Sequence, residues 1–248
     1  MCGKAVGFSV NLPSIRELEL DGRRVFLRAD LDVPLEGRGI VTDDALLRAL
    51  LPTLRLARDA GAKVIIAAHS TRLAPRGRAN AQGAAALPTE HAAPNRSGGA
   101  KKGAVRSLMP VGECLAELLG QEILFPDDCI GDGPRFLASS LREGQVMLLE
   151  NLHRYPAEEA CDDLFSRQLA GLADVFVNDS VATLHRTLAS TVGVARSLPL
   201  RAAGCFLERE FAALSRLVKD PARPFVAVVG GGRLKDKLPA LTALLSRV

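Results

Sequence analysis

The chain has 248 residues, enough for one large domain or two small ones, and its 48% hydrophobic and 24% charged residues are typical of a soluble globular protein. Nine Phe, one Tyr and no Trp argue against a stacking platform for single-stranded nucleic acid, since such platforms need exposed rings. The net charge is +4, but the segment 73–106 alone carries six basic residues and one acidic residue. The positive charge therefore belongs to one segment and is weak evidence for an anionic partner.

The cysteines and the apolar runs bear on the compartment. The five cysteines are scattered and form no Cys-x-x-Cys pair, which favours free thiols in a reducing compartment. No apolar run reaches the ~18 residues of a membrane span, and residues 1–13 lack the apolar core of a signal peptide. We therefore expect a cytoplasmic protein that binds neither membrane nor nucleic acid.

Short apolar runs alternate with longer amphipathic segments along the chain. The apolar runs predict strands at 24–28, 63–68, 146–149, 175–177 and 225–229. The amphipathic segments predict helices at 42–61, 110–119, 158–172, 208–219 and 236–247. Strands of continuous apolar character are buried on both faces. The alternation therefore predicts an α/β fold, a Rossmann-like three-layer parallel sheet with helices on both faces.

The segment 73–106 interrupts this alternation. It is rich in Ala, Gly, Pro and Arg and has no period, which favours an irregular surface insertion. A basic arm for nucleic acid is the alternative, and the composition favours the solvated loop over it.

Polar side chains follow the predicted strands at their carboxyl ends, where parallel α/β sheets bind ligands. They are Arg28, Asp30 and Asp32 after the first strand, His69 and Arg72 after the second, Glu150, Asn151, His153 and Arg154 after the third, and Asn178, Asp179, His185 and Arg186 after the fourth. Converging Arg and His residues suit a small phosphorylated acid. In the alternative interpretation, Asp30 and Asp32 cap a turn, and His69 and His185 support the site without touching a ligand.

A glycine-rich turn follows the fifth predicted strand. Its residues Gly230, Gly231, Gly232, Arg233 and Lys237 can present backbone N–H groups and positive charge to a phosphate, although a simple tight turn has the same composition. The histidines are too dispersed to predict a metal cluster.

These motifs together resemble the phosphoglycerate kinase family over nearly the whole chain outside the insertion. The first match is Arg-Val-Phe-Leu-Arg-Ala-Asp-Leu-Asp-Val-Pro at 24–34. The others lie at 61–69, 127–131, 148–151, 174–179, 185–186, 189–194, 204–210 and 223–231.

The resemblance implies a two-lobed, monomeric glycolytic enzyme that moves a phosphoryl group reversibly between 1,3-bisphosphoglycerate and ADP. The first lobe would hold 3-phosphoglycerate or 1,3-bisphosphoglycerate in a basic patch, and the second would hold Mg-ATP or Mg-ADP. Mapped on this chain, residues 1–204 form the phosphoglycerate-binding lobe with the insertion 73–106. Residues 205–220 form a connecting helix, and 221–248 the first strand–helix unit of an incomplete nucleotide lobe.

Carried over residue by residue, the family motifs are partly retained. Those matching the pattern are Arg28, Asp30, His69, Arg72, His185, Arg186, Gly230, Gly231 and Lys237. Asp32 stands where the family has Asn, His153 stands where it has Arg, with Arg154 one step away, and Arg233 stands for a Lys. Leu46 occupies the position of the family's catalytic Arg, and Leu188 that of a His. We therefore expect impaired phosphoryl transfer. The alternative is a non-catalytic relic or regulatory module that binds a phosphorylated acid.

Overall fold

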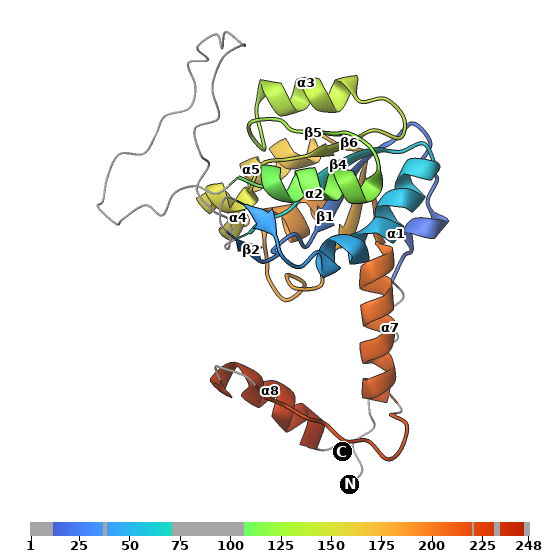
Figure 1. Ribbon diagram of the computed structural model, residues 1–248, viewed down its shortest axis with the longest axis vertical. Helices are drawn as coiled ribbons and strands as arrows, with labels where there is room; N and C mark the ends of the chain where they lie inside the picture. The colour runs from blue at the N-terminus through green and yellow to red at the C-terminus, as the bar shows by residue number, and fades with distance from the viewer. Residues whose placement is uncertain (1–11, 37–38, 71–106, 220, 231–233, 246–248) are drawn as a thin grey trace, which may run out of the picture.

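The computed structural model describes residues 12–36, 39–70, 107–219, 221–230 and 234–245 (Figure 1). The predicted insertion 73–106 lies outside these ranges, as do Arg72, Gly231, Gly232 and Arg233.

A six-stranded sheet forms the centre of the molecule, with the strand order β5-β6-β4-β1-β7-β8. The strands are β1 Arg24–Ala29, β4 Lys63–Ala67, β5 Ile123–Leu124, β6 Val146–Leu148, β7 Val175–Asp179 and β8 Leu200–Ala203. All of their pairings are parallel. A short antiparallel pair, β2 Leu35–Glu36 and β3 Ile40–Val41, lies outside this sheet. The central strand β1 pairs with both β4 and β7, so the carboxyl ends of these three strands lie side by side.

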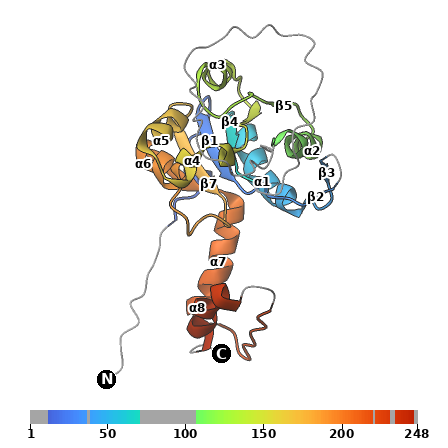
Figure 2. The same cartoon turned by 90° about the vertical axis from the view of Figure 1, so that its left-hand side faces the viewer.

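Helices cover both faces of the sheet (Figure 2). The helices of the described ranges are α1 Ala45–Asp59, α2 Met109–Leu119, α3 Asp132–Ser140, α4 Pro156–Glu159, α5 Asp163–Ala170, α6 Val194–Ser197, α7 Cys205–Lys219 and α8 Leu234–Leu245. Of these, α7 projects away from the sheet and α8 lies apart from it. Short helical turns lie at Ile15–Glu17, Leu152–Arg154 and Ala189–Gly193.

Two apolar cores lie on opposite faces of the sheet. Val25 and Leu27 of β1 pack with α1 and α2, while Phe26 of the same strand packs with α3 and α5. Successive side chains of a strand point to opposite faces, so a strand buried on both faces reads as one continuous apolar run. The predicted α/β fold with helices on both faces is confirmed.

The predicted helix at 158–172 is interrupted. It forms two pieces, α4 and α5, separated by Cys161, whose φ of 50° is left-handed and therefore ends an α-helix. The Asp162 carboxylate then accepts a hydrogen bond of 2.8 Å from the Phe165 backbone nitrogen and begins α5. The left-handed Cys161 and the cap from Asp162 therefore divide a segment whose amphipathic pattern is continuous.

The strand predicted at 225–229 is not formed. These residues are irregular, and Val226 and Val228 are 77% and 95% exposed. A strand needs a neighbour for its backbone hydrogen bonds, and the described part of the chain pairs none with this segment. Helix α7, which coincides with the predicted connecting helix, leads from the sheet toward this segment and α8 (Figure 1). The boundaries of the two lobes stay a prediction.

Candidate functional site

The carboxyl ends of β1, β4 and β7 bring several of the predicted residues together. Arg28 lies within hydrogen-bonding distance of His69, which follows β4, and Asp30 accepts hydrogen bonds from the Ser180 hydroxyl and the Ala182 backbone nitrogen, which follow β7. Asp32 accepts a hydrogen bond from the Ser70 hydroxyl. The two aspartates therefore connect the segment after β1 to the segments that follow β7 and β4.

Arg28 is enclosed, with a relative exposure of 0%. Its Nε donates a hydrogen bond of 2.9 Å to Ser190 Oγ, its Nη1 donates to the Ala29 carbonyl oxygen, and its Nη2 lies 2.9 Å from His69 Nδ1. Burial lowers the pKa of the guanidinium, while the nearby carboxylates of Asp30 and Glu158 oppose this shift. The positive charge of Arg28 is therefore buried beneath the surface of the site.

Glu158 of α4 supports Arg28 through Ser190. The Ser190 hydroxyl donates a 2.5 Å hydrogen bond to Glu158 Oε1, and the Ser190 backbone nitrogen donates a 3.0 Å bond to Glu158 Oε2. Glu158 and Ser190 are 1% and 0% exposed. Burial raises the pKa of the Glu158 carboxyl, and the hydrogen bonds from Ser190 and the charge of Arg28 oppose this.

His69 is half-buried beside this group. Burial, reinforced by the positive charges of Arg28 and Arg186, lowers the pKa of His69 to about 4. Its ring lies 6.3 Å from the ring of His153 between centroids. His69 is therefore neutral at pH 7.

The remaining predicted bases lie nearer to solvent. Arg186 forms an ion pair with Glu159, and its side chain is 34% exposed. Arg154 donates a 3.3 Å hydrogen bond to the Asp127 carbonyl oxygen. His153 and His185 are exposed. These side chains are therefore partly or fully accessible to solvent.

Asn151 joins the segments that follow β4 and β6. The sequence placed it at the carboxyl end of its strand but did not predict this role. Its Oδ1 accepts a 3.0 Å hydrogen bond from the Ser70 backbone nitrogen, and its Nδ2 donates a 2.9 Å bond to the Ser70 carbonyl oxygen. The same Oδ1 accepts a 3.1 Å bond from the His153 backbone nitrogen. Asn151 therefore fixes the backbone next to both His69 and His153.

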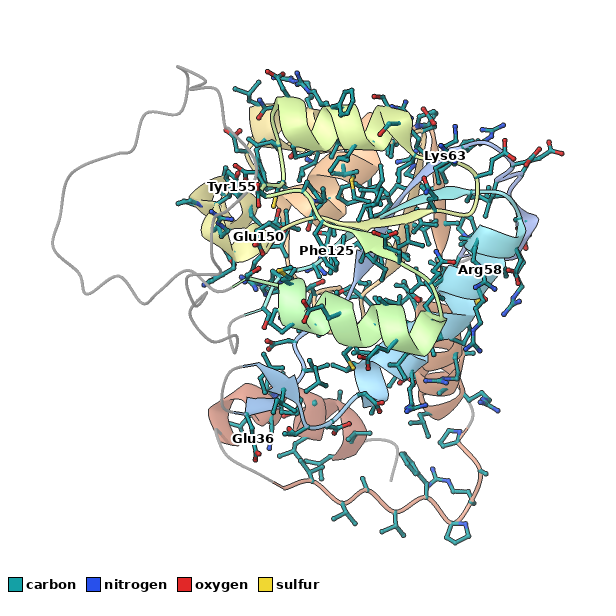
Figure 3. All side chains as sticks on the ribbon, turned by 45° about the horizontal axis from the view of Figure 1, so that its top comes forward. Glu36, Arg58, Lys63, Phe125, Glu150 and Tyr155 are labelled. Atoms are coloured by element: carbon teal, nitrogen blue, oxygen red, sulfur yellow. The ribbon has the colours of Figure 1, made fainter. Side chains whose placement is uncertain are left out.

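Glu150 is buried beside α2 and was also missed as a structural residue. It accepts hydrogen bonds from the Leu108 and Asn151 backbone nitrogens, at 2.9 and 2.7 Å, and from the Ser107 hydroxyl at 2.8 Å. Glu150 and Phe125, both labelled in Figure 3, line a cavity of about 110 Å³. Only the matching motif at 148–151 could have indicated this role, because Ser107 and Leu108 lie 43 and 42 residues earlier in the chain.

Of the residues predicted to bind nucleotide, the structure describes only the first and the last, Gly230 and Lys237. Gly230 is exposed, and a Cβ added there would meet no atom within 4 Å. Lys237 Nζ donates a hydrogen bond to the Gly230 carbonyl oxygen. Within the described ranges, no three His, Cys, Asp or Glu side chains cluster closely enough to hold a metal ion.

The two leucines at family positions of Arg and His are apolar contacts in the structure. Leu46 lies in the first turn of α1, is partly buried and packs against the core on that face of the sheet. Leu188 is 2% exposed. Neither position offers a hydrogen-bond donor from its side chain.

A family model described as phosphoglycerate kinase matches residues 15–248. The chain belongs to the phosphoglycerate kinase family. It is 44% identical over 236 residues to "Phosphoglycerate kinase" of Anaeromyxobacter dehalogenans strain 2CP-1, covering 95% of this chain and 54% of the relative. The "Phosphoglycerate kinase" of Synechococcus sp. strain JA-3-3Ab is 43% identical over 230 residues, covering 93% and 52%.

Solved phosphoglycerate kinases share the fold. The structure from Pyrococcus horikoshii OT3 superposes with a TM-score of 0.77 at 28% identity and covers 95% of this chain and 53% of its own. That from Coxiella burnetii gives 0.71 at 32% identity, covering 96% and 53%. The predicted family and the predicted fold of its N-terminal lobe are confirmed. The chain spans about half the length of the curated relatives it matches. No helix among the described residues is long and apolar enough to cross a membrane.

Proposed function

We propose that this chain binds 3-phosphoglycerate or 1,3-bisphosphoglycerate at the carboxyl ends of β1, β4 and β7, and that its phosphoryl transfer is impaired. The family reaction is the reversible transfer of a phosphoryl group between 1,3-bisphosphoglycerate and ADP in glycolysis. Membership of the family and the gathering of Arg28, His69 and Arg186 at one edge of the sheet support the binding half of the proposal.

The packing of Leu46 supports the second part of the proposal, that phosphoryl transfer is impaired. An Arg there would donate hydrogen bonds to a migrating phosphoryl group, whereas Leu46 is packed against the core of the lobe. Phosphoryl transfer relies on positioning and on charge stabilisation of the transferred group. Loss of one stabilising donor commonly costs ~10²–10³ in rate.

The proposed ligand contacts are the bases that solvent can reach. Arg186, Arg154, His153 and His185 can meet phosphate and carboxylate oxygens, with guanidinium groups matching both oxygens of an acid at once. Arg72 belongs to the proposal through the family motif alone. Arg28, being enclosed, would act on the ligand through its charge and through His69.

The proposed cofactor is Mg-ATP or Mg-ADP. The open backbone at Gly230 and the amino group of Lys237 fit a phosphate group, and Gly231, Gly232 and Arg233 complete the proposed set. Mg²⁺ in such sites is held largely through the nucleotide phosphates and water, so it needs few ligands from the protein. Bound there, it would neutralise phosphate charge during transfer. A monomeric, cytoplasmic protein is part of the same proposal.

A coupled assay of phosphoglycerate kinase turnover on the purified chain tests the impairment. We expect turnover at least 10²-fold below that of a full-length family member, and a rise of roughly 10²-fold in Leu46→Arg. Ala45→Arg is the matched control, because it adds the same charge at an exposed neighbouring position of α1. Turnover equal to that of a full-length enzyme would contradict the impairment.

Calorimetry with 3-phosphoglycerate tests the binding. We expect measurable binding that weakens roughly tenfold in Arg186→Gln, the size of one charge-assisted hydrogen bond. Absence of binding by the wild-type chain would refute the acid site. Binding without turnover, even in Leu46→Arg, would favour the second candidate, a non-catalytic relic or regulatory module, which the apolar burial of both Leu46 and Leu188 supports.

A further inference from the structure

We propose that Glu158 and Ser190 are positioning residues that act through Arg28 to hold His69 as the neutral tautomer carrying its proton on Nε2. The inference rests on the proposed function only in placing His69 at the acid-binding site. The chain of contacts itself is a property of the free protein.

The contacts form one buried line from α4 to the end of β4. Glu158 accepts both the hydroxyl and the backbone hydrogen of Ser190, at 2.5 and 3.0 Å. The Ser190 hydroxyl hydrogen therefore points at Glu158, which leaves a lone pair of Oγ for the 2.9 Å bond from Arg28 Nε. With Nε held there and Nη1 on the Ala29 carbonyl oxygen, the plane of the guanidinium is fixed.

The fixed guanidinium determines where the proton of His69 lies. Arg28 remains protonated in proteins and has donors only. The contact of 2.9 Å between Arg28 Nη2 and His69 Nδ1 must therefore have Nδ1 as its acceptor. A ring whose Nδ1 accepts a hydrogen bond carries its proton on Nε2, and it cannot become an imidazolium without losing that bond.

The charged surroundings of His69 agree with this geometry. The positive charges around it are those of Arg28 and Arg186, and the nearby carboxylate that opposes them is Glu159. The ring of His153 lies 6.3 Å away between centroids. Burial and the two arginines dominate and lower the pKa of His69 to about 4. His69 thus serves the site as a neutral hydrogen-bond donor, while the positive charge beside it belongs to Arg28.

This arrangement gives the buried carboxylate of Glu158 a role in the site. A buried carboxylate is costly unless its oxygens are hydrogen-bonded, and here both oxygens meet Ser190. Its negative charge also favours the charged form of Arg28 in a buried setting. Removal of either Glu158 or Ser190 leaves Arg28 free to reorient and His69 free to take the other tautomer.

The test is a two-bond ¹H–¹⁵N correlation spectrum of the full chain labelled at histidine, recorded without ligand from pH 8 to pH 5. The chain has four histidines, and loss of signals in His69→Gln assigns the residue. We expect wild-type His69 to be the Nε2–H tautomer throughout this range. In Ser190→Ala and Glu158→Gln we expect Nδ1–H signals to appear. We also expect protonation of His69 to become visible near pH 5, because the midpoint rises by roughly one pH unit from about 4.

Ser166→Ala is the matched control, because it removes another buried hydroxyl, 2% exposed and bonded to the Asp162 carbonyl oxygen, outside the chain of contacts. It should leave His69 as in the wild type. Wild-type His69 in the Nδ1–H form, or titrating near its ordinary pKa, would overturn the inference even if both variants failed to fold. Identical His69 signals in Ser190→Ala and the wild type would overturn it as well.

Calorimetry with 3-phosphoglycerate on the same samples separates the two proposals. We expect roughly tenfold weaker binding in Ser190→Ala. A wild-type chain that shows the expected His69 tautomer but binds no 3-phosphoglycerate refutes the proposed function and leaves the positioning role intact. Binding together with the other tautomer refutes the positioning role alone.

Discussion

The Thr53 hydroxyl donates a 2.6 Å hydrogen bond to Asp179 Oδ2, which joins the middle of α1 to the carboxyl end of β7. Both side chains are buried. The same hydroxyl accepts a 2.9 Å bond from the Cys205 backbone nitrogen, and Asp179 Oδ1 accepts a 2.9 Å bond from Leu207 N. The start of α7 is thereby attached to the lobe. Gly204 is required at this point, since a Cβ there would lie 2.3 Å from Asp179 Cγ.

Replacement of Thr53 by the nearly isosteric Val should lower the free energy of unfolding by about 1.5–3 kcal/mol, because Asp179 would lose a donor while remaining buried. Urea denaturation at pH 7 measures the change. Thr53→Ser, which keeps the hydroxyl, should lose clearly less. Equal midpoints for Thr53→Val and the wild type would show that the bond contributes nothing.

Gly112 of α2 is packed against Phe125 and Leu148. A Cβ at this position would lie 2.2 Å from the Phe125 ring and 2.8 Å from Leu148 Cδ2. Gly112→Ala should therefore destabilise the protein by about 1–3 kcal/mol in spite of the better helix propensity of Ala. The control is Gly133→Ala in α3, where a Cβ meets no atom within 4 Å, and there thermal unfolding should show a gain of up to about 1 kcal/mol.

The ion pair of Arg24 and Asp174 should make stability depend on pH. Hydrogen bonds from Arg24 lower the pKa of folded Asp174 below its ordinary value of 3.8. The ionised form is therefore favoured by folding, so the contribution is complete above the unfolded pKa and is lost as the pH falls through the folded one. The Asp174 side chain is 42% exposed, and solvent screening limits the effect to about 0.5–1 kcal/mol.

Urea denaturation of Asp174→Asn and the wild type at several pH values measures this contribution. The two midpoints should differ at pH 7 and converge as the pH is lowered below 3.8. A difference that stays constant down to acid pH would show that Asp174 acts through its shape or its neutral hydrogen bonds.

The irregular conformation of residues 225–229 has a direct test. Val228 is 95% exposed, so Val228→Lys should change the free energy of unfolding by no more than about 0.5 kcal/mol. Val175→Lys is the contrast, because Val175 is fully buried in β7 and a charge there should abolish folding. A large loss of thermal stability in Val228→Lys would indicate that this segment forms the strand that the sequence predicts.

The four inner strands of the sheet, β6, β4, β1 and β7, were predictable from the local pattern of apolar residues. Val25, Phe26 and Leu27 lie on alternate faces and all are buried, so their apolar run identified β1. The two-residue strand Ile123–Leu124 is too short to show any period, and helix α3 has a polar sequence with Gly and Pro in its first turn. These elements are formed by packing against the sheet, which local sequence does not report.

The candidate site was predictable in its location but not in its connections. The topology of a parallel sheet places Arg28 and His69 at one edge, which the spacing of the strands indicated. Arg28 and Ser190, however, are 162 residues apart, and nothing near either residue specifies their bond. Glu158 and Asn151 likewise act on partners from other elements, so only the folded chain shows that they support the site.

The central place of β1 in the sheet has a consequence for how the protein is made. Val25 pairs with Val64 on one side but with Val175 on the other. At synthesis rates of about 5–20 residues per second, β1 waits for its second neighbour for roughly 8–30 s. During that time the edge of β1 that pairs with β7 lacks its native neighbour strand. The nascent chain should therefore depend on chaperones until β7 has left the ribosome, and late pairing of β1 with β7 should limit the rate of refolding in vitro.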